Sequence, residues 1–278
     1  GAGAALGSRE LTFAPGPVAP GAYRFAVGTA GSACLVLQTV APALVTAGGP
    51  SHLVLEGGTH NPKAPPFDFL ARVFLPLLAR MGPRVSAAIE RHGFYPAGGG
   101  RVVVDIAPAP ALAPIELLAP LEVEARRARA LLARLPRHIG ERELRVVQDR
   151  LGWSEAECAI EEVDSPGPGN ALHLEVVGAG SSELASGFGE RGVPAETVAL
   201  GAADEVRALL AAGVPVGCHL ADQLLLPLAL AGGGAFLTLP LSLHARTAID
   251  VIAAFGAARF EVQPAAGGNA VVVAAPAG

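Results

Sequence analysis

The sequence predicts an α/β (α+β) fold in which a large domain of repeated αβ units carries a smaller αβ domain as an insertion. Strand, helix, strand and strand patterns follow one another in residues 51–107, and a similar order returns after residue 221. Between these regions, residues 119–212 contain most of the arginines and glutamates. We therefore expect a core domain of residues 1–118 and 213–278 and an inserted domain of residues 119–212.

The first repeated unit follows a region of loop and short strands, residues 1–27, that is rich in proline. YRFAV is expected to be a strand ending at Gly28, and a helix is expected from about Cys34 to Ala47. The small residues before this helix could leave backbone N–H groups free for an anion, although a tight turn needs the same glycines. A strand in SHLVLEGG, a polar loop in GTHNPKAPP, a helix at 67–81 and strands at 85–90 and 101–106 complete the unit.

The second unit is organised around residues 219–244, HLADQLLLPLALAGGGAFLTLPLSLH. Its first residues place an imidazole, a carboxylate and a carboxamide ahead of an apolar run, 224–231, that is too short to span a bilayer and should form a buried helix. Glycines end this helix, and a strand is expected at 235–239. His244 then opens an amphipathic segment that ends at Phe255, and strands near 259–262 and 269–273 follow.

The inserted region has its own strand and helix patterns. Helices are expected at 139–151 and 195–212, with a strand at 171–177 between them. Acidic and basic residues interleave in the charged run LEVEARRARALLARLPRHIGERELR, residues 121–145. We expect this run to be a solvated surface rather than a nucleic-acid face.

Composition restricts the class of protein. Of 278 residues, 51% are hydrophobic and 16% are charged, which is typical of a globular protein. The net charge of −5 argues against a protein that wraps a long nucleic acid around its surface. It does not exclude a protein that binds the end of one strand. No signal segment and no apolar run of membrane-helix length is present, so the cytoplasm is expected.

The cysteines and the opening residues carry two further expectations. Cys34, Cys158 and Cys218 are odd in number, far apart and in apolar sequence surroundings. Free thiols in a reducing compartment are therefore expected, rather than a disulfide framework or a zinc site. The chain opens on GAGAALGSRELTF without an initiator methionine, and we expect that a preceding part of the domain is missing.

The candidate chemistry depends on histidine. The sequence contains no glycine-lysine phosphate loop, zinc-spaced Cys/His cluster, nucleophile elbow or Rossmann fingerprint. Of the seven histidines, His244 is favoured because it follows a Pro-Leu-Ser turn and opens an element. A neutral imidazole can attack phosphorus and form a reactive phosphoramidate. The alternative is that His244 merely caps a helix.

Several stretches, taken together, resemble the RNA 3'-terminal phosphate cyclase family. They occur in the family's order from Tyr23 to His244, and HGFYPAGGG and LADQ are the most specific. The stretches are RFAVGTAGSACLVLQT, GGTHNPKAPPFDF, RHGFYPAGGG, PRHIGERE, GPGN and HLADQLLLPLALAGGG. This resemblance implies a large domain of repeated βαβαββ-type units with a smaller αβ domain inserted, as the patterns themselves predict.

The resemblance also implies a reaction. The histidine that aligns with His244 would attack the α-phosphorus of ATP, release pyrophosphate and carry AMP. AMP would then pass to the 3'-phosphate of an RNA end, and the neighbouring 2'-OH would attack to give a 2',3'-cyclic phosphate. This is ligase-class chemistry that forms a phosphoric ester and releases AMP. A divalent metal, Mg²⁺ or Mn²⁺, would offset charge on the triphosphate.

Site residues are implied in the same way. Pro65 would pack on one face of the adenine and the ring of His219 on the other, with hydrogen bonds from Asp222 and Gln223. The implied ATP contacts are Gln38, Pro65, His219, Leu220, Ala221, Asp222 and Gln223. For Gln38 the alternative is an exposed polar residue of a helix. The family's metal ligand lies in a preceding segment that nothing in this chain matches, so adenylation by this chain could be weak or absent.

Two other functions compete with this one. A non-catalytic cyclase-like protein of ribosome biogenesis has the same fold, but that branch lacks the nucleophilic histidine and this chain has His244. An inactive fragment of the cyclase is a variant of that alternative. A fold-related enolpyruvyl transferase would need clusters of lysine and arginine for anionic substrates, and Lys63 is the only lysine.

Overall fold

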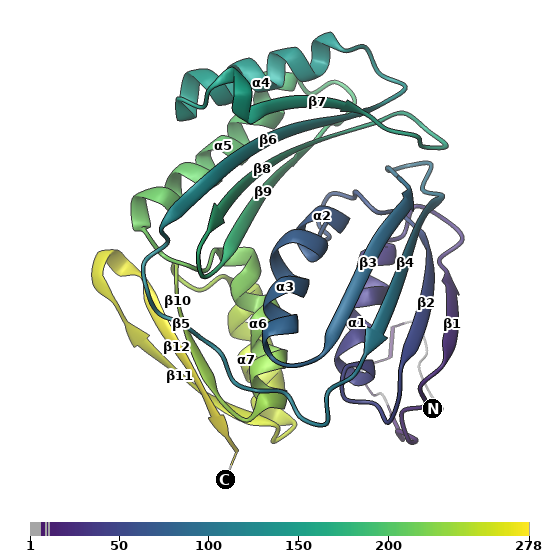
Figure 1. The fold of residues 1–278 in the computed structure, drawn as a ribbon, viewed down its shortest axis with the longest axis vertical. Coiled ribbons are helices and arrows are strands. Elements are labelled where there is room, and N and C mark those ends of the chain that lie inside the picture. Colours follow the sequence, from purple (N-terminus) through teal and green to yellow (C-terminus); the bar gives the residue numbers. More distant parts are fainter. Residues whose placement is uncertain (1–6, 9, 11, 278) are drawn as a thin grey trace.

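A computed structural model describes residues 7, 8, 10 and 12–277 and confirms the predicted α/β class. Within these residues the chain forms three four-stranded sheets, each packed against helices (Figure 1). Two sheets belong to the lower part of the molecule in Figure 1 and enclose helices α1, α3, α6 and α7 between them. Part of the loop predicted at the N-terminus falls on residues 1–6, 9 and 11, which lie outside the described residues.

The first unit has the order βαβαββ. Its strands lie side by side as β1-β2-β4-β3, with β1 parallel to β2 and the other pairs antiparallel. A helical segment with a central π-helical turn at Leu70–Phe74 joins β2 to β3. The elements are β1 Ala22–Ala26, α1 Ala33–Leu44, β2 Ser51–Gly57, α2 Phe67–Phe69, α3 Leu75–Arg80, β3 Arg84–Arg91 and β4 Gly100–Ala107.

The second unit repeats this plan. Its strands have the order β5-β10-β12-β11, again with the first pair parallel and the others antiparallel. The predicted internal repeat is therefore confirmed at the level of strand order and direction. The elements are β5 Glu116–Leu117, α6 Cys218–Ala231, β10 Gly234–Thr238, α7 Leu243–Ala254, β11 Ala258–Pro264 and β12 Ala270–Pro276.

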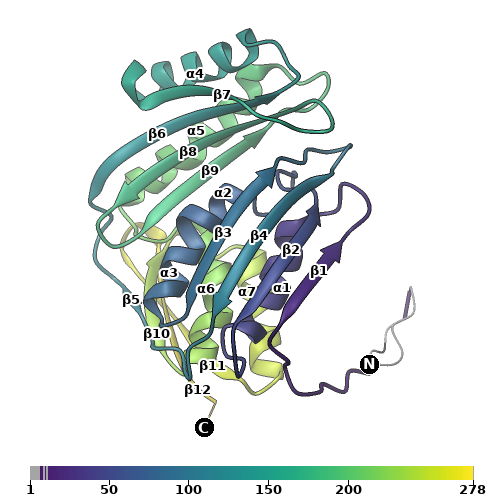
Figure 2. The same ribbon diagram turned by 45° about the vertical axis from the view of Figure 1, so that its right-hand side comes forward.

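One hydrophobic core joins the two units, because the helices of both lie between the sheets (Figure 2). Leu53 and Leu55 alternate with more exposed residues along β2 and point into this core, as a half-buried strand requires. Leu220 and Leu224 of α6 and Phe236 of β10 belong to the same cluster. The site residues on α6 are therefore fixed to both units.

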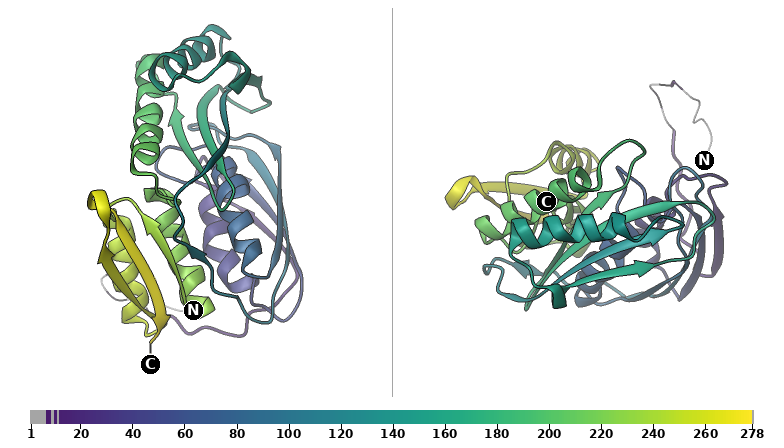
Figure 3. Two further views of the ribbon diagram at one scale, coloured as in Figure 1. Left: turned by 60° about the vertical axis from the view of Figure 1, so that its left-hand side comes forward. Right: turned by 90° about the horizontal axis from the view of Figure 1, so that it is seen from above.

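A third sheet, β7-β6-β8-β9, lies between β5 and α6 in the chain and packs against α4 and α5 (Figure 3). It has a separate core that includes Val147, Trp153 and Leu172. Its elements are β6 Val123–Ala133, α4 His138–Leu151, β7 Cys158–Glu162, β8 Gly169–Gly178, β9 Ser182–Phe188 and α5 Ala195–Ala212. The division of the chain at 118/119 and 212/213 stays a prediction.

Two sequence expectations were wrong in detail. Helix α6 begins at Cys218, so the HLADQ segment lies within the helix rather than ahead of it. The charged run at 121–145 is not a uniformly solvated surface, since residues 123–133 form β6 and the side chain of Arg129 is only 12% exposed, paired with Asp68. No helix in the described part of the chain is long and apolar enough to span a membrane.

Candidate active site

The first turns of α6 present the polar residues of the HLADQ segment. His219 is largely exposed, with 66% of its side chain accessible, and Asp222 and Gln223 follow one turn later on the same side. Leu220 and Ala221 instead point into the core, where both are buried. This arrangement follows from helical periodicity, which places the apolar pair on the face toward the core and the polar residues on the face toward solvent.

Asp222 and Gln223 form a polar pair at a half-buried position. The Gln223 side-chain N–H donates to Asp222 Oδ1 at 3.2 Å. The Gln223 Oε1 atom is buried and has no hydrogen-bond partner among the described residues. Burial raises the pKa of the Asp222 carboxyl, and the nearby imidazoles of His219 and His244 oppose this rise. The pair can therefore offer donors and acceptors to a bound molecule.

His244 is the second residue of α7 and is exposed. Its helix is capped by Ser242, whose hydroxyl accepts the N–H of Ala245 at 3.1 Å. The imidazole therefore does not serve as the helix cap. Helices α6 and α7 pack against each other, so His244 and Asp222 lie on neighbouring helices. The ring is not sealed in the core.

Gln38 and Pro65 lie in the first unit. Gln38 is half-buried on α1, and Pro65 is half-buried in the loop between β2 and α2. Neighbouring Leu37 on α1 belongs to the same core cluster as Leu220 of α6. The alternative interpretation of Gln38 was an exposed polar residue on a helix, but its side chain is half-buried. Its contact with a nucleotide, like that of Pro65, stays a prediction.

Comparison with known proteins identifies the family. The sequence pattern of the family described as "RNA 3'-terminal phosphate cyclase" matches residues 1–262. Relatives from several organisms carry that name. The relative from Koribacter versatilis is 51% identical over 261 residues, which cover 94% of this chain and 74% of the relative. The relative from Ectopseudomonas mendocina is 50% identical over 254 residues, which cover 91% of this chain and 74% of the relative. The relative from Salmonella typhimurium is 46% identical over 268 residues, which cover 96% of this chain and 79% of the relative.

The chain belongs to the RNA 3'-terminal phosphate cyclase family. Within this cyclase-family chain, the set around His244 does not fit a magnesium or manganese site. These ions favour charged oxygen ligands, usually one or two carboxylates together with phosphates. Asp222 already accepts from Gln223, and burial raises its pKa, so it fits a contact to a nucleoside better than a metal ligand.

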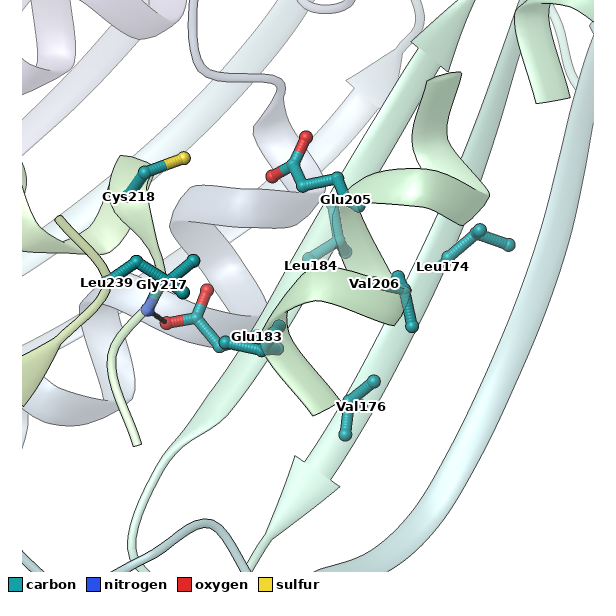
Figure 4. Close-up of a pocket in the computed structure, with 11 residues that line it drawn as sticks. Leu174, Val176, Glu183, Leu184, Glu205, Val206, Gly217, Cys218 and Leu239 are labelled. Atoms are coloured by element: carbon teal, nitrogen blue, oxygen red, sulfur yellow. Dashed lines mark hydrogen bonds between the residues drawn. The ribbon is translucent and has the colours of Figure 1, made fainter. Parts of the chain in front are cut away.

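A second group of polar residues surrounds the N-terminus of α6 (Figure 4), and the sequence did not predict it. His219 Nε2 lies 3.3 Å from Glu205 Oε1 of α5. The neighbouring Cys218 thiol and the Glu205 carboxylate raise the pKa of His219 to about 11. Glu183 of β9 accepts the backbone N–H of Gly217 at 2.5 Å. Burial raises the pKa of Glu183 to about 8, although that N–H opposes the rise.

A buried network joins the first unit to the third sheet, β7-β6-β8-β9, and the sequence did not predict it. His60 Nε2 lies 2.9 Å from Asp68 Oδ2, and His173 Nε2 of β8 lies 3.6 Å from the same oxygen. Arg129 of β6 donates to the other oxygen. Burial would raise the pKa of Asp68, but the His60 hydrogen bond and the charges of His173, His60 and Arg129 hold it well below its usual range. Burial lowers the pKa of His173 to about 3.

Proposed function

We propose that the protein is an RNA 3'-phosphate cyclase that uses ATP to convert an RNA 3'-phosphate into a 2',3'-cyclic phosphate. The observation that carries the proposal is the position of His244. Its side chain is exposed at the start of α7, a helix that packs against α6 with its Asp222, and the capping role at α7 is filled by Ser242. An accessible imidazole without a structural role is suited to nucleophilic attack.

The proposed reaction has three displacements at phosphorus. A ring nitrogen of His244 bonds to the α-phosphorus of ATP, the bond to the bridging oxygen breaks, and pyrophosphate leaves. An oxygen of the RNA 3'-phosphate then bonds to the same phosphorus and the imidazole leaves. Finally the ribose 2'-oxygen attacks the 3'-phosphorus, loses its proton and expels AMP. Adenylation turns an unreactive phosphate oxygen into part of a leaving group, while the 2'-OH is already held beside its target.

The neighbouring residues would bind the nucleotide. Asp222 and Gln223 are assigned to hydrogen bonds with the adenosine, and the unpartnered Gln223 Oε1 supports this because a buried acceptor is costly when it remains unpaired. His219 and Pro65 are assigned to the two faces of the adenine, and Gln38 to a further ATP contact. Leu220 and Ala221 are buried, so their contribution would come through the backbone and the shape of the pocket.

A direct assay tests the proposal. An RNA with a labelled 3'-phosphate is incubated with the protein, ATP and Mg²⁺, and the product is treated with a phosphatase. Cyclisation protects the label from the phosphatase, whereas the unreacted monoester loses it. Protection that requires ATP and disappears in His244→Ala supports the proposal. His138 is a matched control, because it is an exposed histidine in the first turn of α4. Full protection by His244→Ala would refute the assigned role.

A further inference from the structure

The N-terminus of α6 meets two acidic side chains of the inserted domain. The ligand atoms of Cys218, His219 and Glu205 all lie within 4.8 Å of one another. Cys218 and His219 are the first two residues of α6, whereas Glu205 comes from α5. We propose that these three side chains form a binding site for a thiophilic divalent cation of the zinc class, which would link α5 to α6.

The spacing suits such an ion. Zinc lies about 2.3 Å from sulfur and about 2.0–2.2 Å from nitrogen and oxygen, so tetrahedral ligand atoms are about 3–4 Å apart. The distance of 3.3 Å between His219 Nε2 and Glu205 Oε1 falls in this range. Figure 4 shows the Cys218 sulfur and the Glu205 carboxylate turned toward the same space. A small adjustment of the side chains would therefore complete the site.

The ligand types and the space favour zinc over magnesium. A thiolate is a soft ligand, which hard cations such as Mg²⁺ do not select, and a helix N-terminus stabilises the thiolate form. Three protein ligands leave a fourth position open. A cavity of about 20 Å³ adjoins Cys218 and is also lined by Glu183 and Gly217. A cavity of this size has room for one water molecule.

The charges around this group also favour a cation. Glu205 brings a carboxylate to the site, and among the described residues no Lys or Arg side chain forms a salt bridge with it. The other cluster of metal-ligand types, His60, Asp68 and His173, differs in this respect. There the guanidinium of Arg129 already neutralises Asp68 and would repel a metal ion. The group at the N-terminus of α6 is therefore the better cation site of the two.

Occupation of the site would affect the nucleotide. A cation at Cys218 and Glu205 would hold the ring of His219 toward α5, and His219 is one of the two residues assigned to the adenine. Bound zinc would then compete with ATP. This consequence rests on the proposed function, whereas the cation site itself does not.

Cobalt provides the test, because Co²⁺ replaces zinc and gives a thiolate-to-metal charge-transfer band. The chelator-treated protein, residues 1–278, is titrated with Co²⁺ in the absence of ATP and RNA, and Zn²⁺ is then added. We expect a charge-transfer band that saturates at one equivalent and is displaced by Zn²⁺. Cys218→Ser should abolish the band, and Glu205→Gln should weaken Co²⁺ binding by about tenfold or more.

The matched control is Cys158→Ser. Cys158 is also half-buried and has carboxylates of Glu155 and Glu157 nearby, but no histidine is assigned to it. This variant should keep the band. Absence of a band in the parent protein, or its survival in Cys218→Ser, would overturn the proposal. Circular dichroism verifies that each variant is folded, and Glu205→Gln provides a second measurement if Cys218→Ser does not fold. The Co²⁺ titration contains no ATP or RNA, so a negative result would refute the cation site without bearing on the cyclase activity.

Discussion

Asp68 and His244 hold the same place in the two repeated units. Each is the second residue of the helix that follows the second strand of its unit, α2 after β2 and α7 after β10. Asp68 is only 9% exposed because Arg129 and His173 of the inserted domain pack against it, whereas His244 is exposed. The same position therefore contacts the third sheet in one unit and presents an exposed imidazole in the other.

Asp68→Asn should loosen the contact with the inserted domain. The substitution removes the negative charge between His60, His173 and Arg129. The buried guanidinium of Arg129 then loses the carboxylate with which it forms its closest ion pair. Loss of one partner of a buried ion pair costs about 3 kcal/mol. Urea unfolding followed by circular dichroism would measure the loss.

Asp105→Asn is the control for that experiment. Asp105 also pairs with a histidine, His52, at 2.7 Å, but its side chain is 65% exposed. Exposed pairs contribute little, so the free energy of unfolding should change by less than about 1 kcal/mol. Equal losses for Asp68→Asn and Asp105→Asn would mean that the buried network does not hold the domains together.

Glu143→Gln should stabilise the protein at neutral pH. Glu143 is fully buried in the inserted domain, and burial raises the pKa of its carboxyl to about 7, despite a hydrogen bond from Asn170. The folded state therefore holds a proton that the unfolded state releases near pH 4.5. This makes the free energy of unfolding fall as pH rises from about 4.5 to 7, by on the order of 1–3 kcal/mol.

A neutral glutamine removes this pH dependence and can still accept from Asn170. Urea unfolding of the parent protein and of Glu143→Gln at pH 5 and at pH 8 would measure both effects. We expect the variant to gain more at pH 8 than at pH 5. A larger gain at pH 5 would show that the buried carboxyl is ionised in the folded state.

Gln223→Ala should weaken nucleotide binding while leaving the fold intact. The variant removes the buried Oε1 and the donor to Asp222, both of which the proposal assigns to the nucleotide pocket. Loss of such hydrogen bonds corresponds to about a tenfold rise in the Kd for ATP. Calorimetric titration with ATP measures it, with Gln263→Ala on the exposed part of β11 as the control. An unchanged Kd in Gln223→Ala would remove Gln223 from the site.

Local patterns predicted most of the elements. The helix predicted at 195–212 has the same bounds as α5, and the sequence reveals the repeat because each unit shows its own strand and helix periodicities. Strand β6 was missed because its charges suggested a solvated surface. Arg127 and Arg129 are paired with Glu175 and Asp68, which are far away in the sequence, and no local pattern can reveal such partners.

The site was predicted only in part, for the same reason. His219, Asp222, Gln223 and His244 were named from their segment and from a family resemblance. The apolar surroundings expected for Cys218 were wrong, because folding brings Glu205 of another helix beside Cys218 and His219. Helix α6 also starts earlier than expected, at Cys218 rather than at 221. Tertiary contacts thus created both polar clusters that the sequence did not reveal.

Covalent labelling tests the central claim most directly. The protein is incubated with α-labelled ATP and Mg²⁺, quenched in alkali, since a phosphoramidate is labile to acid, and the labelled peptide is identified by mass spectrometry. We predict AMP on the peptide that contains His244, retention of label in His138→Ala and its loss in His244→Ala. Label on a different residue, or undiminished label in His244→Ala, would contradict the account.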